Sequence, residues 1–179
     1  GDDYNIANIQ RVTSAVANSI QAKRHLSRGV VVGFDTRFQS DRFAQATAEV
    51  LSAHGIPVIL ADRPTPTPAL SYAVIARKAS NGIMITASHN PYNWNGFKIK
   101  APEGCSVSKK VTRDIERRIP NRYLPASLRR KQEPARIKTT DLITPYLKNL
   151  EPFIDFEKIR ASGLRFVIDA MYGAGRHCL

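Results

Sequence analysis

The chain has 179 residues, of which 42% are hydrophobic and 23% charged, the proportions of a globular protein with one core and room to begin a second. No apolar run approaches the ~20 residues of a transmembrane helix, and the first residues are acidic where a signal peptide is basic. The two cysteines have neither a metal-binding spacing nor the number needed for a disulfide framework. We therefore expect a cytoplasmic protein with reduced thiols and no role in a membrane.

The formal net charge of +12 is concentrated in one segment. Residues 98–138 hold thirteen Lys or Arg side chains and only four acidic ones. A nucleic acid could bind such a surface, but the segment lacks interleaved aromatic residues, a glycine–aromatic RNA-binding signature and zinc-finger spacing. We favour a solvated basic helix face and loop over a nucleic-acid partner, and the same positive field would attract an anionic ligand.

Apolar spacing predicts alternating helices and strands in the first hundred residues. Intervals of three and four residues favour helices, and short β-branched runs favour buried strands. Ser40 or Asp41 is expected to cap the second helix, and Thr67 the third, with Pro68 in its first turn. The expected helices span 6–26, 40–54 and 67–78. The expected strands span 30–34, 56–60, 82–86 and 96–100.

This alternation predicts an α/β fold, a three-layer α/β/α domain with a mixed, mostly parallel sheet. Functional residues of such sheets gather at the carboxyl ends of the strands. Arg37 and Ser88 both lie just beyond the expected end of a strand. The pattern therefore favours a functional site at this edge over two unrelated structural turns.

The second half of the chain is less regular. We expect a helix over 107–119, capped by Ser106 or Ser108, and later a helix over 139–150. The remaining segments are a basic, proline-containing excursion over 120–134, a connection over 152–163, and a strand over 164–169 with a glycine turn. This order predicts one domain over 1–150 and the start of a second over 151–179. Because the last strand has no helix to cover it, we expect the chain to be a fragment.

The run Thr-Ala-Ser-His-Asn-Pro at 86–91 is the strongest functional signal. Its serine, Ser88, follows an apolar strand on a turn closed by Asn-Pro, with His89 beside it and Lys98 ten residues on. A hydroxyl so placed suits a serine that accepts and gives a charged group, although a turn hydroxyl can also simply bond the local backbone. No Gly-x-Ser-x-Gly elbow surrounds Ser88, which argues against an α/β-hydrolase.

With Asn-Gly-Phe-Lys at 95–98, this run resembles the phosphoserine loop of the α-D-phosphohexomutases, the phosphoglucomutase/phosphomannomutase family. Further segments resemble the same family in the same order, at 30–37, 55–58, 64–70 and 169–175. The last of these resembles the glycine turn that opens the family's second domain. The resemblance implies an isomerase that interconverts hexose 1-phosphate and hexose 6-phosphate through a phosphoserine at Ser88 and a bisphosphorylated sugar.

The resemblance also implies roles for four more residues. His89 would donate to a phosphate or a sugar hydroxyl, and Lys98 would transfer protons. Arg37 and Asn90 would bind the substrate or its phosphate. The residues themselves leave simpler alternatives open: a structural histidine, a solvated lysine, a salt-bridged arginine and an asparagine that shapes its turn.

The family resemblance further implies Mg²⁺ as cofactor. The family's second domain supplies three aspartates in an Asp-Gly-Asp-x-Asp-Arg loop, and no such run occurs in this sequence. Only Ser88, through its phosphate, carries over as a metal ligand. The sequence therefore predicts that the chain alone is nearly inactive and leaves the identity of the hexose open. A non-catalytic sugar-phosphate-binding domain is the alternative.

Overall fold

The computed structural model describes residues 4–22, 28–123 and 133–178, and its centre is a five-stranded sheet in the order β4-β3-β1-β2-β5. The four parallel strands are β1 (Val30–Phe34), β2 (Val58–Ala61), β3 (Asn81–Ile85) and β5 (Ile137–Thr140). The edge strand β4 (Phe97–Lys100) is antiparallel to β3. The predicted mixed, mostly parallel sheet is confirmed.

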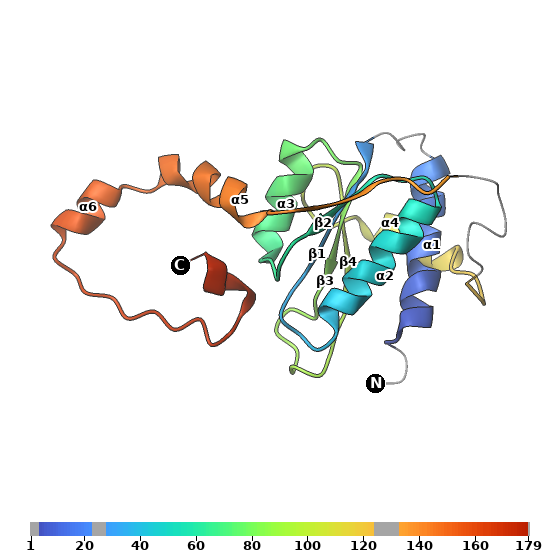
Figure 1. The fold of residues 1–179 in the computed structure, drawn as a ribbon, viewed down its shortest axis with the longest axis horizontal. Helices are drawn as coiled ribbons and strands as arrows, with labels where there is room; N and C mark the ends of the chain where they lie inside the picture. Colours follow the sequence, from blue (N-terminus) through green and yellow to red (C-terminus); the bar gives the residue numbers. More distant parts are fainter. Residues whose placement is uncertain (1–3, 23–27, 124–132, 179) are drawn as a thin grey trace.

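Helices cover both faces of this sheet (Figure 1). One face carries α2 (Ser40–Ala53), with α1 (Ile6–Ala22) packed on it and α4 (Lys109–Arg117) beside α1. The other face carries α3 (Thr67–Ala76), against which α5 (Ile143–Leu150) packs. Connections between parallel strands through a helix are right-handed. Because β2 lies on one side of β1 and β3 on the other, the helices of the two connections, α2 and α3, lie on opposite faces of the sheet. The predicted three layers are confirmed.

The core lies on both sides of β1, all of whose residues are buried. A central parallel strand is covered on both faces, which explains the continuous Val-Val-Val run. On α4, by contrast, only Ile115 is buried and the lysines and arginines are exposed, as expected of a solvated basic face. Among the described residues, no helix is long and apolar enough to cross a membrane. Cys105 and Cys178 are free thiols, as predicted.

One strand contradicts the sequence prediction. Residues 139–150 were expected to form a single helix, but Ile137–Thr140 is strand β5 and the helix begins only at Ile143. The four-residue strand is too short to show a period, and its parallel pairing with β2 decides its conformation. The other strands agree with their predicted spans to within two residues.

Helix ends account for the remaining differences inside this domain. Neither Ser40 nor Thr67 is a cap, since α2 and α3 begin after Gln39 and Pro66, which make no side-chain cap hydrogen bond. The Ser108 cap of α4 is confirmed, because its hydroxyl accepts from the Val111 N–H. The predicted continuation of the first helix to residue 26 and most of the 120–134 excursion lie outside the described residues.

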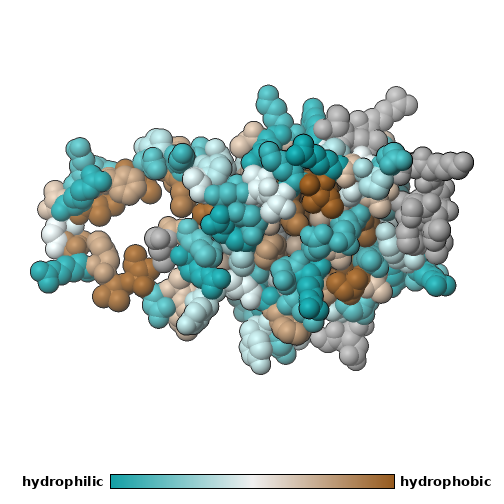
Figure 2. Space-filling view, in the orientation of Figure 1, coloured by the Kyte–Doolittle hydropathy of each residue, from teal (hydrophilic) through white to brown (hydrophobic). Residues whose placement is uncertain are grey.

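After α5 the chain runs away from the sheet and its helices as a wide loop (Figure 1). The expected connection contains a 3₁₀ turn, Glu151–Phe153, and a short helix, α6 (Phe156–Ala161). The strand expected over 164–169 is wrong, because no described segment pairs with it and a strand needs a neighbour for its backbone groups. Apolar side chains stand exposed along the loop (Figure 2), among them Phe153, Leu164, Phe166, Val167 and Ile168.

Asp141 stabilises the start of α5 through its carboxylate, which accepts from the N–H groups of Ile143 at 2.7 Å and Thr144 at 3.1 Å. A hydrogen bond from the Thr144 hydroxyl lowers the pKa of Asp141 from its ordinary 3.8, with these backbone bonds acting in the same direction. Asp141→Ala should lower the free energy of unfolding by about 1 kcal/mol near pH 7.

Urea unfolding at several pH values checks this prediction. Because the pKa is lower in the folded state, the stabilisation is present above about pH 4 and is lost as the pH falls through the folded-state value. The two proteins should therefore converge in acid. Asp155→Ala is the matched control, since Asp155 caps α6, which has no buried residue. A difference that does not shrink as the pH falls below about 4 would contradict the assignment.

Candidate active site

The five residues singled out in the sequence line one cavity of about 790 Å³ at the carboxyl ends of β1 and β3. Ser88, His89 and Asn90 come from the turn after β3, Lys98 from β4, and Arg37 from the loop after β1. The register pairs Phe34 of β1 with Ile85 of β3, so the two loops leave the sheet side by side. The parallel arrangement thus brings together residues about 50 positions apart in the sequence.

Ser88 stands on a tight turn with a left-handed backbone, φ 56°. Its N–H donates to the hydroxyl of the buried Thr86 at 3.0 Å, and the Asn90 N–H donates to the Ala87 carbonyl at 3.1 Å. A non-glycine residue in this region costs roughly 1–3 kcal/mol unless its surroundings hold it. The turn directs the Ser88 hydroxyl toward β4.

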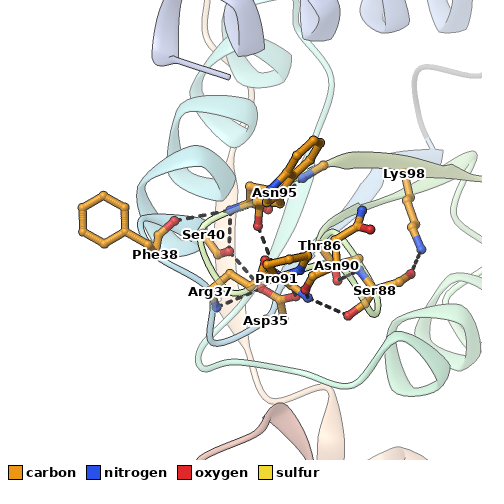
Figure 3. Close-up of polar contacts among 12 residues, drawn as sticks. Asp35, Arg37, Phe38, Ser40, Thr86, Ser88, Asn90, Pro91, Asn95 and Lys98 are labelled. Carbon is orange, nitrogen blue, oxygen red and sulfur yellow. Dashed lines mark hydrogen bonds and ion pairs between the residues drawn. The ribbon is translucent and has the colours of Figure 1, made fainter. Parts of the chain in front are cut away.

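Lys98 meets that hydroxyl: its Nζ donates to Ser88 Oγ (Figure 3). The β3–β4 register sets Lys98 opposite Met84, and both side chains line the cavity. An ammonium group in contact with a serine hydroxyl can exchange a proton with it or balance negative charge on a group that the serine carries. The structure therefore joins the two residues that the sequence placed ten positions apart.

Arg37 lies beneath the turn and contacts its backbone (Figure 3). The terminal N–H groups of its guanidinium donate, at 2.6–3.2 Å, to the carbonyls of Ser88, Asn90, Pro91 and Trp94. Its Nε pairs with Asp35 Oδ2 at 3.2 Å. Both side chains are largely buried, with exposed fractions of 12% for Arg37 and 14% for Asp35.

His89 and Asn90 are exposed at the tip of the turn. Among the described residues, neither side chain has a hydrogen-bonding partner, so both remain available to a ligand in the cavity. Three supporting residues escaped the sequence analysis: Asp35, Thr86 and Asn95. All three stand inside segments that the family resemblance used, but nothing in their spacing indicated which side chains they would contact.

The described residues supply no metal site of their own. No three His, Cys, Asp or Glu side chains within 4–22, 28–123 and 133–178 are grouped closely enough to hold an ion. Asp35, the one carboxylate among the described residues that line this cavity, is already engaged by Arg37 and Ser40. These residues do not fit Mg²⁺ by themselves, and a phosphoryl group on Ser88 would be their only contribution.

Gly96 links the turn to β4 at a point with no room for a side chain. A Cβ atom there would lie 2.7 Å from the Thr86 carbonyl oxygen, closer than real Cβ contacts. Gly96→Ala should therefore push β4 and Lys98 away from Ser88 and destabilise the chain by about 1–3 kcal/mol, as other overpacking substitutions do.

Thermal unfolding of the 179-residue chain tests this expectation. Gly175→Ala is the control, because a Cβ at Gly175 would meet no atom within 4 Å. Equal melting temperatures for the two variants would mean that the Thr86–Gly96 approach is not tight in solution.

Comparison with known proteins places these features in context. The family model described as phosphoglucomutase/phosphomannomutase, alpha/beta/alpha domain I, matches residues 1–125. A phosphoglucomutase of Staphylococcus haemolyticus is 33% identical over 173 residues, covering 93% of this chain and 31% of that protein. A phosphoglucosamine mutase of Chelativorans sp. is 35% identical over 170 residues, covering 92% of this chain and 36% of that protein.

Solved structures give the same result. The crystal structure of a putative phosphomannomutase from Thermus thermophilus superposes with a TM-score of 0.76 at 34% identity, covering 92% of this chain and 35% of that one. The chain therefore spans about a third of the length of the relatives it matches.

Proposed function

The chain belongs to the phosphoglucomutase/phosphomannomutase family, and we propose that it is part of a mutase that interconverts hexose 1-phosphate and hexose 6-phosphate through a phosphoryl group on Ser88. The observation that supports this most directly is the contact between Lys98 Nζ and Ser88 Oγ at the mouth of the cavity. The hydroxyl that would carry the phosphoryl group stands on a strained, well-held turn, and the ammonium that would serve it reaches it from β4.

The proposed reaction has two transfers. In the first, a hydroxyl oxygen of the bound hexose phosphate forms a bond to phosphorus as the Ser88 Oγ–P bond breaks, which yields a bisphosphorylated sugar. The Lys98 ammonium gives a proton to the Ser88 oxygen as that oxygen is released, and the resulting neutral amine takes the proton of the attacking hydroxyl. In the second, Ser88 Oγ forms a bond to the other phosphorus as the sugar O–P bond breaks. The Ser88 proton passes through Lys98 to the released sugar oxygen, and the isomeric monophosphate leaves.

Positioning and charge account for most of the catalysis in phosphoryl transfer. We assign the positioning of the substrate at the tip of the turn to His89 and Asn90. Their exposed side chains line the cavity and would donate to phosphate or sugar oxygens. The substrates are hexose phosphates. The positive charge of residues 98–138 would favour such anions over neutral sugars.

The cofactor and the rest of the catalytic machinery are expected to lie elsewhere. Phosphoryl transfer commonly uses a divalent cation to polarise the phosphoryl oxygens, so we propose Mg²⁺ dependence, with the carboxylate ligands outside the described residues. Because the chain spans about a third of its relatives, we further propose that it works as part of a longer cytoplasmic enzyme and is nearly inactive alone.

Intact-mass spectrometry tests the proposal. The polypeptide in which this chain is continued by the rest of its reading frame should gain about 80 Da, one phosphoryl group, on exposure to a hexose bisphosphate, with the group mapped to Ser88. Assays on glucose, mannose and glucosamine phosphates would then identify the sugar. Binding of hexose phosphates without any phosphorylation of Ser88 would support the non-catalytic alternative and overturn the mutase.

A further inference from the structure

The guanidinium of Arg37 has no free donor. An arginine carries five N–H groups, and here one faces Asp35 while the others donate to four carbonyls of the Ser88 turn. A phosphate ligand would have to displace at least two of these bonds to be held bidentately. The contacts are therefore those of a group that serves the protein backbone.

Asp35 fixes the guanidinium in turn. Its Oδ2 pairs with Arg37 Nε, while its Oδ1 accepts from the Arg37 N–H at 3.0 Å and from the Ser40 hydroxyl at 2.9 Å. Its own N–H donates to the Ile85 carbonyl at 3.2 Å, at the end of β3. The carboxylate thus anchors Arg37 to the ends of both central strands, from which the two loops depart.

The far end of the turn is tied to the same anchor. Asn95 donates to the Ser40 hydroxyl at 2.8 Å and accepts from the Gly96 N–H at 2.9 Å. Ser40 in turn donates to Asp35. The segment 88–95 is therefore held at its start, middle and end by a single, largely buried ion pair and its hydroxyl partner.

We propose that Arg37 is a positioning residue, which holds the Ser88 turn in its left-handed form through four backbone carbonyls, and that it does not bind the substrate's phosphate. This inference rests on the proposed function for its catalytic consequence, but the contacts that carry it are independent of any ligand. It replaces the phosphate-binding role that the family resemblance implied for Arg37.

Arg37→Lys tests the proposal because an ammonium keeps the charge but has only three N–H donors, too few for the four carbonyls and Asp35. Hydrogen exchange in the chain should accelerate by at least about tenfold for amides of residues 86–96, with β1 and β3 unchanged, since only the local hold is lost. In the longer enzyme, kcat should fall by about 10²-fold, the effect of a small misplacement of a reacting group, while KM for hexose phosphate stays within about twofold.

Arg118→Lys is the matched control, since within the described part of the chain Arg118 pairs only with Asp114, on the surface. A raised KM with unchanged kcat and unchanged exchange would make Arg37 a phosphate ligand and overturn the proposal. If the wild-type enzyme proves to have no mutase activity but Arg37→Lys still accelerates hydrogen exchange in the turn, the positioning role of Arg37 stands and the proposed function fails. If Arg37→Lys does not fold, Asp35→Asn, which removes the ion pair, should also accelerate exchange in the turn, and unchanged exchange would overturn the proposal.

Discussion

Ser88→Ala is expected to lower mutase activity of the longer enzyme by at least about 10⁴-fold, the scale of loss when a covalent nucleophile is removed. Both proposed transfers use the Ser88 oxygen, so its loss should stop the forward and the reverse reaction alike. The substitution removes only the hydroxyl, and Lys98 loses its partner without any change in the backbone contacts of Arg37. The variant should fold normally and gain no mass with a hexose bisphosphate.

Ser106→Ala is the control for this experiment, because Ser106 is also exposed but lies before α4, away from the cavity of Ser88. That variant should keep full activity and the full mass gain. Phosphorylation of Ser88→Ala to the wild-type extent would place the phosphoryl carrier on another residue and refute the proposed mechanism.

Lys98→Met should reduce kcat by about 10²–10⁴-fold, the usual contribution of a positioned acid–base group. Methionine has a similar length but cannot donate to Ser88 or take a proton from a sugar hydroxyl. We expect enzyme that already carries the phosphoryl group to retain it for longer when substrate is added. Rapid-quench measurement of phosphoenzyme decay would separate this effect from weaker substrate binding.

The same strand provides the control. Lys100 lies two residues further along β4, on the same face, opposite Gly82. Lys100→Met removes an identical charge from the basic segment but does not touch Ser88, so its kcat should remain within about twofold of wild type. An equal loss in both variants would mean that Lys98 acts only through the overall positive field.

Much of the fold could be predicted because its strands are apolar runs of a recognisable kind. The run at 30–34 is β-branched and buried on both faces, whereas the caps expected of the neighbouring helices, Ser40 and Thr67, are not caps in the structure. Strand β5 could not be predicted, since its four residues form a strand only by pairing with β2, and no local pattern specifies that partner. The stretch 164–169 shows the reverse case, an apolar run without a partner among the described residues.

In the site too, contacts within a short motif could be predicted from the sequence, and contacts between distant segments could not. Ser88, His89 and Lys98 belong to a compact motif, so their proximity followed from the chain order. The role of Arg37 depends on carbonyls 51–57 positions away, and backbone acceptors have no signature in a sequence. From sequence alone, a charged residue near a site is easily interpreted as a ligand-binding residue. In the structure, the largely buried carboxylate of Asp35 pairs with Arg37 and orients it toward the protein backbone.

The left-handed backbone at Ser88 also limits which amino acids can replace this serine during evolution. Threonine carries a hydroxyl of the same reactivity, but a β-branched residue is a strained outlier at positive φ. Glycine and asparagine would relieve the strain and offer no oxygen that can be phosphorylated. If Ser88 carries the phosphoryl group as proposed, a lineage that retains this turn can keep the acceptor only as serine, and a change to threonine would require the turn itself to be rebuilt.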